Sequence, residues 1–221
     1  MIFLNNNNRI DKAAKRFKEI TKPDSYHYQQ KFKYLPNWLD NTSYYYQREA
    51  NKRLPQKYYY YKRGTIIRVN FGTNLGSEFS NIHFAIVLDK KDSPNKKTLT
   101  VLPLTSKQKS DRFSLGGEVF NQTIILLIQQ MQQIKKKLDK LRDEDSPDFK
   151  EIDKDISDLN KVVDLYSRYN KNSFVRLSDI TTISKLRIER LNKFDPSGKI
   201  RLSDQQMALI SHELLKLYLS E

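Results

Sequence analysis

The sequence contains no cysteine and only three histidines among its 221 residues. The first absence excludes disulfides, thiolate metal sites and cysteine nucleophiles, and three scattered histidines argue against a histidine-rich metal centre. Long apolar runs are missing too, since no stretch approaches the roughly 18 consecutive apolar residues of a membrane span. The N-terminus lacks a signal-peptide pattern because its short apolar run precedes the charges. We therefore expect a cytoplasmic protein with no membrane segment, metal or other cofactor.

Glycine is also scarce, and five of the six glycines lie between residues 64 and 117. This part of the chain contains three strand-like runs joined by short loops, "GTIIRVNFG", "IHFAIVLDKK" and "TLTVLPLTSK", and a fourth strand is expected at "FSLGGEVF". Glycine permits the turns and bulges that a strongly curved sheet needs. Strand patterns return in "SFVRLSDITTI". The spacing predicts a small β-barrel.

Between these strand regions, residues 121–172 have the apolar spacing of two helices of roughly 20 residues each, with Ser146 and Pro147 as the break. We expect an antiparallel helical hairpin with two heptad-like seams. A last helix is expected from Asp204, because Ser203 and Gln206 have the spacing of a capping box. The first predicted seam comprises Ile124, Leu127, Met131, Ile134, Leu138 and Leu141, and the second comprises Phe149, Ile152, Ile156, Leu159, Val163 and Tyr166.

The net charge of +14 is unevenly distributed, since residues 1–63 contain 14 basic and 5 acidic residues and therefore contribute +9. Ten of the thirteen tyrosines precede Gly64, and a basic amphipathic helix is expected at 10–20. Interleaved tyrosines and basic residues are typical of surfaces that stack bases and hold phosphates. The same tyrosines could instead pack the extension onto the main domain, and both readings stay open here.

These patterns predict an α+β protein in three parts. Residues 1–61 would form a basic, tyrosine-rich and partly helical extension. Residues 62–120 and 173–221 would form one barrel domain, since strand patterns lie on both sides of the helical segment. Residues 121–172 would be a coiled-coil-like hairpin inserted into that domain.

Three ordered blocks of the predicted barrel resemble the MazF/PemK family of toxin endoribonucleases. They are "KRGTIIRVNFGTNLGSE" leading into "HFAIVLDKK", then "TLTVLPLTSK", and finally "SDITTISKLRI". The resemblance covers 62–115 and 173–219. It implies a small SH3-like barrel, usually a homodimer, that cleaves single-stranded RNA without a metal by attack of a 2′-OH on the adjacent phosphate. It also implies a cognate antitoxin as partner, with growth inhibition or phage defence as the setting.

The resemblance also suggests site residues. The family's threonine falls on Thr105, and its catalytic arginine falls on His83, a residue that can act directly as an acid or a base near neutral pH. We therefore expect a catalytic set of His83, Thr105, Ser106 and Lys107, with no metal. The expected substrate-binding residues are Arg63, Ser77, Glu78, Arg176, Ser178, Asp179 and Arg187.

Two other functions remain open from the sequence. Because the family's arginine is replaced, the chain could be a catalytically inactive module that binds nucleic acid or protein. It could also poison a protein target, as gyrase poisons of the CcdB type do with a similar barrel. A fold alone does not decide between activities.

Overall fold

The computed structural model describes residues 2–24, 29–142 and 148–219. The expected helix break at Ser146 and Pro147 lies outside these residues. The chain divides into two units, one comprising residues 1–56 and 70–82 and the other residues 57–69 and 83–221. In the described part, no helix is long and apolar enough to cross a membrane.

The first unit is mainly helical. It contains α1 (Ile2–Ile20), the short helix η1 (Gln30–Tyr34) and α2 (Leu35–Ala50), in which a proline occupies the first turn. The sequence predicts a helix only at 10–20, so α2 was missed because its tyrosines and polar residues lack a clear apolar stripe. Gly72 lies directly against the ring of Trp38, where a Cβ atom would come within 2.6 Å of the indole. Its φ of +87° is also one that glycine adopts readily.

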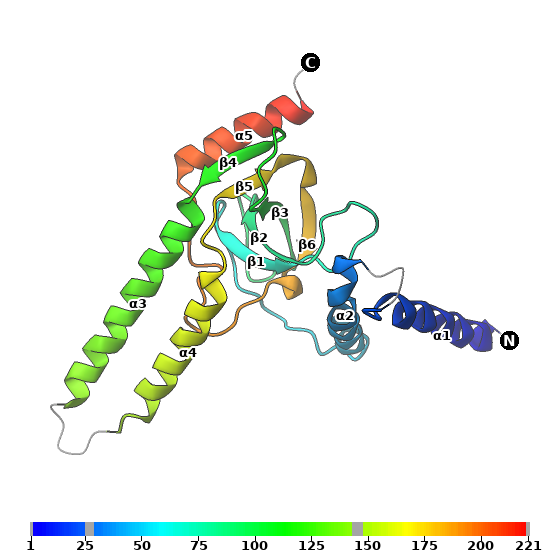
Figure 1. Ribbon diagram of the computed structural model, residues 1–221, viewed down its shortest axis with the longest axis horizontal. Helices are drawn as coiled ribbons and strands as arrows, with labels where there is room; N and C mark the ends of the chain where they lie inside the picture. The colour runs from blue at the N-terminus through cyan, green and yellow to red at the C-terminus, as the bar shows by residue number, and fades with distance from the viewer. Residues whose placement is uncertain (1, 25–28, 143–147, 220–221) are drawn as a thin grey trace. The chain divides into compact units, whose positions relative to one another are not determined.

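The second unit is built on an antiparallel sheet. Its strands are β1 (Ile66–Asn70), β2 (Ile82–Val87), β3 (Thr98–Thr105), β4 (Arg112–Gly116), β5 (Ser173–Arg176) and β6 (Thr181–Ser184). The order across the sheet is β1-β2-β3-β5-β4, and β6 also pairs with β3 (Figure 1). All four strands expected before residue 120 are present. The α+β class is confirmed, and closure of the sheet into a barrel stays a prediction.

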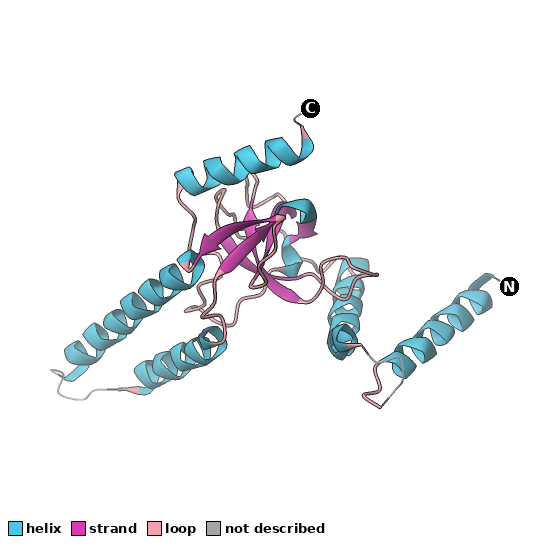
Figure 2. Cartoon of the chain, turned by 45° about the horizontal axis from the view of Figure 1, so that its top comes forward, coloured by secondary structure: helices cyan, strands magenta, loops and turns pink. Residues whose placement is uncertain are grey.

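One face of the sheet is covered by α5 (Asp204–Tyr218), as Figures 1 and 2 show. Met207 and Ile210 of α5 pack in a core with sheet residues such as Ile86, Leu102 and Val175. The helix begins with the predicted capping box, in which Ser203 and Gln206 bond each other's backbone N–H groups. The capping residues therefore determine where α5 starts. The apolar face of α5 determines that the helix covers the sheet.

The helical hairpin is present as α3 (Glu118–Arg142) and α4 (Lys150–Ser167), which lie side by side in both views. It connects β4 to β5, and these two strands pair with each other. The hairpin is therefore an insertion between two neighbouring strands of the sheet. The remaining short helices of this unit are η2 (Leu177–Asp179) and η3 (Lys185–Arg187).

In the hairpin, α3 and α4 face each other with residues that differ in part from the expected ones. Five residues expected at the contact are exposed: Ile124, Met131, Phe149, Ile156 and Val163. The buried positions of α4 are Ile152, Asp155, Leu159, Val162 and Tyr166, and those of α3 include Thr123 and Gln130. The prediction for those five apolar residues was wrong because the buried positions include the polar residues Thr123, Gln130 and Asp155 instead.

Asp155 shows how a polar group occupies that seam. Its carboxylate is 3% exposed and forms ion pairs with Lys137 of α3, at 3.3 Å, and with Lys193 from the segment after η3. Burial by itself raises the pKa of Asp155, but the two ammonium groups outweigh it and hold the pKa below the ordinary value of 3.8. The charged form therefore joins three separate segments.

We expect Asp155→Asn to lower the free energy of unfolding by about 1–3 kcal/mol at neutral pH, the usual size of hydrogen bonds to charged groups. A depressed folded-state pKa adds stability above the unfolded pKa, and that stability is lost as the pH falls through the folded pKa. The difference from wild type should therefore shrink below about pH 4. Urea unfolding at pH 7 and pH 3 tests this, with the exposed Asp164→Asn as control. A difference independent of pH would contradict the assignment.

Candidate functional site

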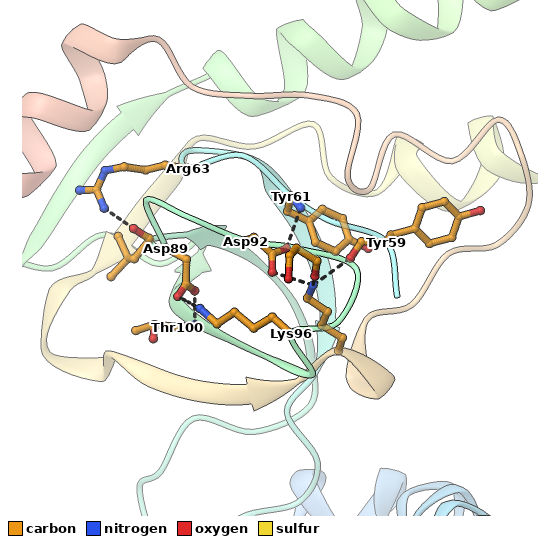
Figure 3. A network of polar contacts seen from close by, with 10 residues as sticks. Tyr59, Tyr61, Arg63, Asp89, Asp92, Lys96 and Thr100 are labelled. Atoms are coloured by element: carbon orange, nitrogen blue, oxygen red, sulfur yellow. Dashed lines mark hydrogen bonds and ion pairs between the residues drawn. The ribbon is translucent and has the colours of Figure 1, made fainter. Parts of the chain in front are cut away.

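The connection between β2 and β3 is fixed by Asp89. Its carboxylate accepts a hydrogen bond from the backbone N–H of Thr100 at 2.6 Å and also pairs with Lys96 (Figure 3). Both partners follow Asp89 along the chain, so the carboxylate closes the loop onto the start of β3. This contact sets the register in which the two strands meet.

That register places His83 and Thr105 in one row. The paired positions are Ala85 with Pro103, Ile86 with Leu102 and Val87 with Val101. The recorded pairs end at Ala85 and Pro103, and alternation along each strand puts His83 on the face of Ala85 and Thr105 on the face of Pro103. Both residues are half-buried.

The opposite face of these strands is apolar, as the sequence predicts. Leu102 and Leu104 are buried in the core beneath α5, and Ile86 and Phe84 pack there too. Ala85 and Val87 are also fully buried, so the half-buried position on this face of β2 is His83, near the start of the strand. The polar row therefore lies at the end of the sheet where β2 begins and β3 ends.

The turn that follows β3 is held by two hydrogen bonds. The backbone N–H of Lys107 donates to Oγ1 of Thr105 at 3.2 Å, and the carbonyl of Lys107 accepts from Nη1 of Arg112 at 2.5 Å. Ser106 and Lys107 are exposed at this turn. Arg112 thus fixes the residues that follow Thr105.

Pairing of β3, β5 and β4 brings two arginines to the same face. Thr105 lies opposite Phe174, and Arg112 lies opposite Arg176 two residues further along β5. By alternation, these residues share the face that carries Thr105. Arg176 in turn forms an ion pair with Asp179 at 2.5 Å, and the hydroxyl of Ser178 donates to the same carboxylate at 3.1 Å.

Arg112 is an unusual cation. Its side chain is 6% exposed, its Nε has no hydrogen-bond partner among the described residues, and the exposed carboxylate of Asp111 approaches Nε only to 3.8 Å. A buried charge without close compensation is costly, and functional sites are where such groups are retained. With Lys107 and Arg176 nearby in the fold, Arg112 leaves this face with an excess of positive charge suited to an anion.

Arg112 was missed in the sequence analysis, which starts the strand at Phe113. Alternation of Arg112 and Ser114 with Phe113 and Leu115 could have indicated a polar face. The pairing of β4 with β5 across the hairpin, which places Arg112 opposite Arg176, is not readable from sequence.

The other expected residues lie elsewhere. The guanidinium of Arg63 donates to the carbonyl of Leu88, beside Asp89 (Figure 3). It also donates to the hydroxyl of Ser211 at 2.9 Å and so joins the end of β2 to α5. Arg187 belongs to η3, which follows the end of β6 that pairs with Thr98, at the opposite end of β3 from Thr105. Ser77 and Glu78 are exposed in the loop between β1 and β2, which belongs to the first unit.

Comparison with known families matches residues 62–160 to the family described as PemK-like, MazF-like toxin of type II toxin–antitoxin systems. Residues 62–160 form a PemK/MazF-like toxin domain. The match includes β1 to β4 with His83, Thr105, Ser106, Lys107 and Arg112, and it ends within α4. No curated protein matches the chain at a significant level.

The third resembling block, which contains Ser178 and Asp179, lies beyond the matched residues. The structure nevertheless pairs β5, just before that block, with both β3 and β4 of the PemK/MazF-like domain. Residues outside the match therefore complete the sheet on which the candidate site lies.

We expect Arg112→Met to leave the melting temperature at or above that of wild type in low-salt buffer without phosphate. The variant loses the bond to the Lys107 carbonyl, but it also ends the desolvation of a guanidinium whose nearest carboxylate is exposed and 3.8 Å away. Inorganic phosphate should raise the melting temperature of wild type but not of the variant, because ligand binding to the folded state stabilises it.

Thermal unfolding across a phosphate series, with chloride at matched ionic strength, checks this. Arg142→Met, at the exposed end of α3, is the control. A large loss of stability in Arg112→Met without phosphate would mean that the arginine serves the fold and not an anion.

Proposed function

We propose that this chain is a metal-independent endoribonuclease toxin that cleaves single-stranded RNA and is restrained by a cognate antitoxin. The observation that carries the proposal is the face of the sheet that His83 and Thr105 share, which also carries Lys107, Arg112 and the Asp179-paired Arg176. RNA is a polyanion with a nucleophile beside every phosphodiester. A site that combines a titratable imidazole with several cations suits that substrate.

In the proposed reaction, the 2′-oxygen forms a bond to the neighbouring phosphorus and the bond from phosphorus to the 5′-oxygen breaks. The products are a cyclic phosphate and a free 5′-OH. His83 in its neutral form takes the proton of the 2′-OH as general base. Lys107, exposed beside Thr105, donates a proton to the departing 5′-oxygen, which leaves as the 5′-OH.

Negative charge grows on the phosphoryl oxygens during this step, so donors fixed in advance lower the barrier. The hydroxyl of Thr105 accepts from the Lys107 N–H, and its own proton can therefore point toward a phosphate oxygen. Arg112 holds this turn through the Lys107 carbonyl. It is a positioning residue that also supplies positive charge where the family's arginine is missing from the start of β2.

The remaining expected residues keep substrate-binding roles in this proposal. Arg176, Ser178 and Asp179 form one hydrogen-bonded and ion-paired group at the end of β5, and Arg176 faces Arg112. They would contact the RNA beyond the scissile phosphate. Arg63, Ser77, Glu78 and Arg187 stay proposed contacts, with Arg63 the weakest because its guanidinium already bonds Leu88 and Ser211.

We also infer that the sheet closes into an SH3-like barrel. Isolated bridges join Val69 to Ile188 and Thr65 to Arg201, so the second edge of β1 pairs with the segment that follows β6. Because β6 itself pairs with β3, these bridges support a closed path of strands. By analogy with the family, we also propose that the protein is a homodimer in the cytoplasm.

A second candidate function is a catalytically inactive PemK/MazF-like module that binds RNA or protein. It is favoured by the histidine that stands where the family has its arginine. The two functions differ in whether RNA is cut, so one assay separates them.

We expect purified protein to cleave a long single-stranded RNA in EDTA and to leave cyclic phosphate and 5′-OH ends. His83→Ala should reduce the rate by about 10²–10⁴-fold, the usual contribution of general acid–base catalysis. Thr105→Ala should also be slow, and Thr105→Ser should recover most of the activity because it retains the hydroxyl. End mapping and single-turnover rates check these results.

Ser106→Ala is the matched control, since its exposed side chain neighbours Thr105 on the same turn. Equal cleavage by wild type and His83→Ala would remove His83 from the mechanism. Binding of RNA by wild type without any cleavage would support the inactive module.

A further inference from the structure

The segment before β1 is fixed to the second unit by its backbone. The N–H of Tyr58 donates to the Pro94 carbonyl at 2.9 Å, and the N–H of Tyr61 donates to Oδ2 of Asp92 at 2.8 Å (Figure 3). The ammonium of Lys185 donates to the carbonyl of Tyr59 at 3.0 Å. These bonds hold residues 58–61 in one conformation.

Lys185 and Asp92 form a buried ion pair beneath this segment, and every donor of the Lys185 ammonium has an acceptor. The side chains of Lys185 and Asp92 are 2% and 0% exposed and lie 2.8 Å apart. Lys185 uses its other protons on the carbonyls of Tyr59 and Ser93, so all three of its donors are occupied. The pair therefore serves to anchor the segment and offers nothing to a ligand.

The tyrosines of this segment have different environments. The ring of Tyr61 is buried against Gly198, where an added Cβ atom would meet the ring at 2.9 Å. The ring of Tyr59 is 72% exposed, although its backbone is fixed. An aromatic ring held rigidly in solvent contributes little to the core, and such rings commonly mark binding surfaces.

Arg190 lies over the ring of Tyr59 at 5.2 Å, a cation–π distance. Its Nε is buried without a hydrogen-bond partner, and no carboxylate pairs with it in the described part of the chain. The stacked pair thus presents a flat aromatic surface next to an uncompensated cation.

Lys199 adds a second cation to this surface. Its ammonium donates to the carbonyl of Lys193 and forms no ion pair within residues 2–24, 29–142 and 148–219. Lys199 follows Gly198, which lies against the ring of Tyr61 in the same segment as Tyr59. Burial, and then the charge of Arg190, lower the pKa of Lys199, while Asp195 raises it. By contrast, the cations Arg68 and Lys193 are each paired with a carboxylate, although Nε of Arg68 also lacks a hydrogen-bond partner among the described residues.

We propose that Tyr59, Arg190 and Lys199 form a second contact surface for single-stranded RNA, separate from the row that contains His83 and Thr105. One base stacks on the exposed face of the Tyr59 ring, and the adjacent phosphates bind the two cations. This inference rests on RNA being the substrate, as proposed above. The surface acts on affinity for long RNA and not on the bond-breaking step.

The chemistry favours RNA over an acidic protein segment. Carboxylates would satisfy Arg190 and Lys199 but would leave the exposed Tyr59 ring without a use. A nucleotide uses both parts, since every base has a face that can stack and every linkage carries a negative charge. Stacking also requires no particular base, so the surface would hold RNA of many sequences.

The test measures binding separately from cleavage. A fluorescein-labelled oligouridine of about twelve nucleotides, within the range of single-strand binding sites, carries 2′-O-methyl groups. Because it lacks the attacking hydroxyl, it cannot be cut. Anisotropy titrations at several salt concentrations compare wild type with Tyr59→Ala, Arg190→Gln and Lys199→Gln.

Tyr60→Ala is the matched control, since Tyr60 is the neighbouring residue and is 61% exposed without a cation over its ring among the described contacts. Tyr59→Ala retains the carbonyl that accepts from Lys185. Melting temperatures of all variants should therefore stay close to that of wild type.

We expect Tyr59→Ala to weaken binding about tenfold, a typical loss for one stacked base, and Tyr60→Ala to stay within about twofold. Arg190→Gln and Lys199→Gln should each reduce the slope of log K against log salt by about 0.7, as for one phosphate contact on a single strand. On an all-ribose RNA, Tyr59→Ala should raise KM and leave kcat unchanged.

Equal losses in Tyr59→Ala and Tyr60→Ala would overturn the proposal. The proposal would also be overturned if Arg190→Gln and Lys199→Gln weakened binding while Tyr59→Ala did not. That result would indicate an electrostatic surface suited to an acidic protein. Wild-type protein that binds the oligomer through Tyr59 but does not cut the all-ribose RNA supports this surface and refutes the proposed ribonuclease.

Discussion

Strand β3 forms backbone pairs along both of its edges, and the second unit is arranged around them. Val101 pairs with Val87 of β2 on one side and with Thr181 of β6 on the other, while Leu104 and Thr105 pair with β5. Because β5 and β6 share one edge of β3, the chain must turn between them, and it does so at η2. That turn contains Ser178 and Asp179 beside Arg176. The end of the same strand supplies Thr105, so the candidate site depends on how β3 is paired.

The charged groups of the second unit divide into two kinds. Asp195 is fully buried and accepts hydrogen bonds from the hydroxyl of Tyr166 and from the N–H groups of Leu191 and Ser197. Lys185 and Asp92 are buried with every donor of the ammonium occupied. Such groups join segments and have no capacity left for a ligand. Arg112 and Arg190 differ because each has a buried Nε with no hydrogen-bond partner in the described chain, and the carboxylate of Asp111 stays 3.8 Å from Nε of Arg112.

Arg112 and Arg190, each with an unbonded Nε in the described chain, support the proposed function because they could bind phosphate. Desolvating a guanidinium without a matching anion costs stability, and a bound phosphate would recover that cost. The two arginines lie in different places, one on β4 and the other in the segment after η3. A long, flexible polyanion such as single-stranded RNA can reach both, whereas a small anion would occupy one. In the proposed function, His83 takes the position of the family's arginine, and positive charge comes from other elements.

Local sequence determined the strands, the capped start of α5 and the existence of the hairpin, because alternation, capping residues and apolar spacing act over a few neighbouring residues. The resemblance to PemK/MazF toxins was likewise readable from three short blocks, and the first two lie within the matched residues. The contacts of the hairpin were not readable, since Asp155 takes a seam position only when Lys193, far along the chain, pairs with it.

Tertiary structure alone decided which residues face one another. His83 and Thr105 are 22 positions apart and Arg112 and Arg176 are 64 apart, and their juxtaposition follows from strand register. Register is set by the Asp89 turn and by the burial of Leu102 and Leu104, where a shift of one residue would turn the polar row toward the core. Sequence determined the chemical groups that the protein possesses. The paired strands decided which of those groups could act together.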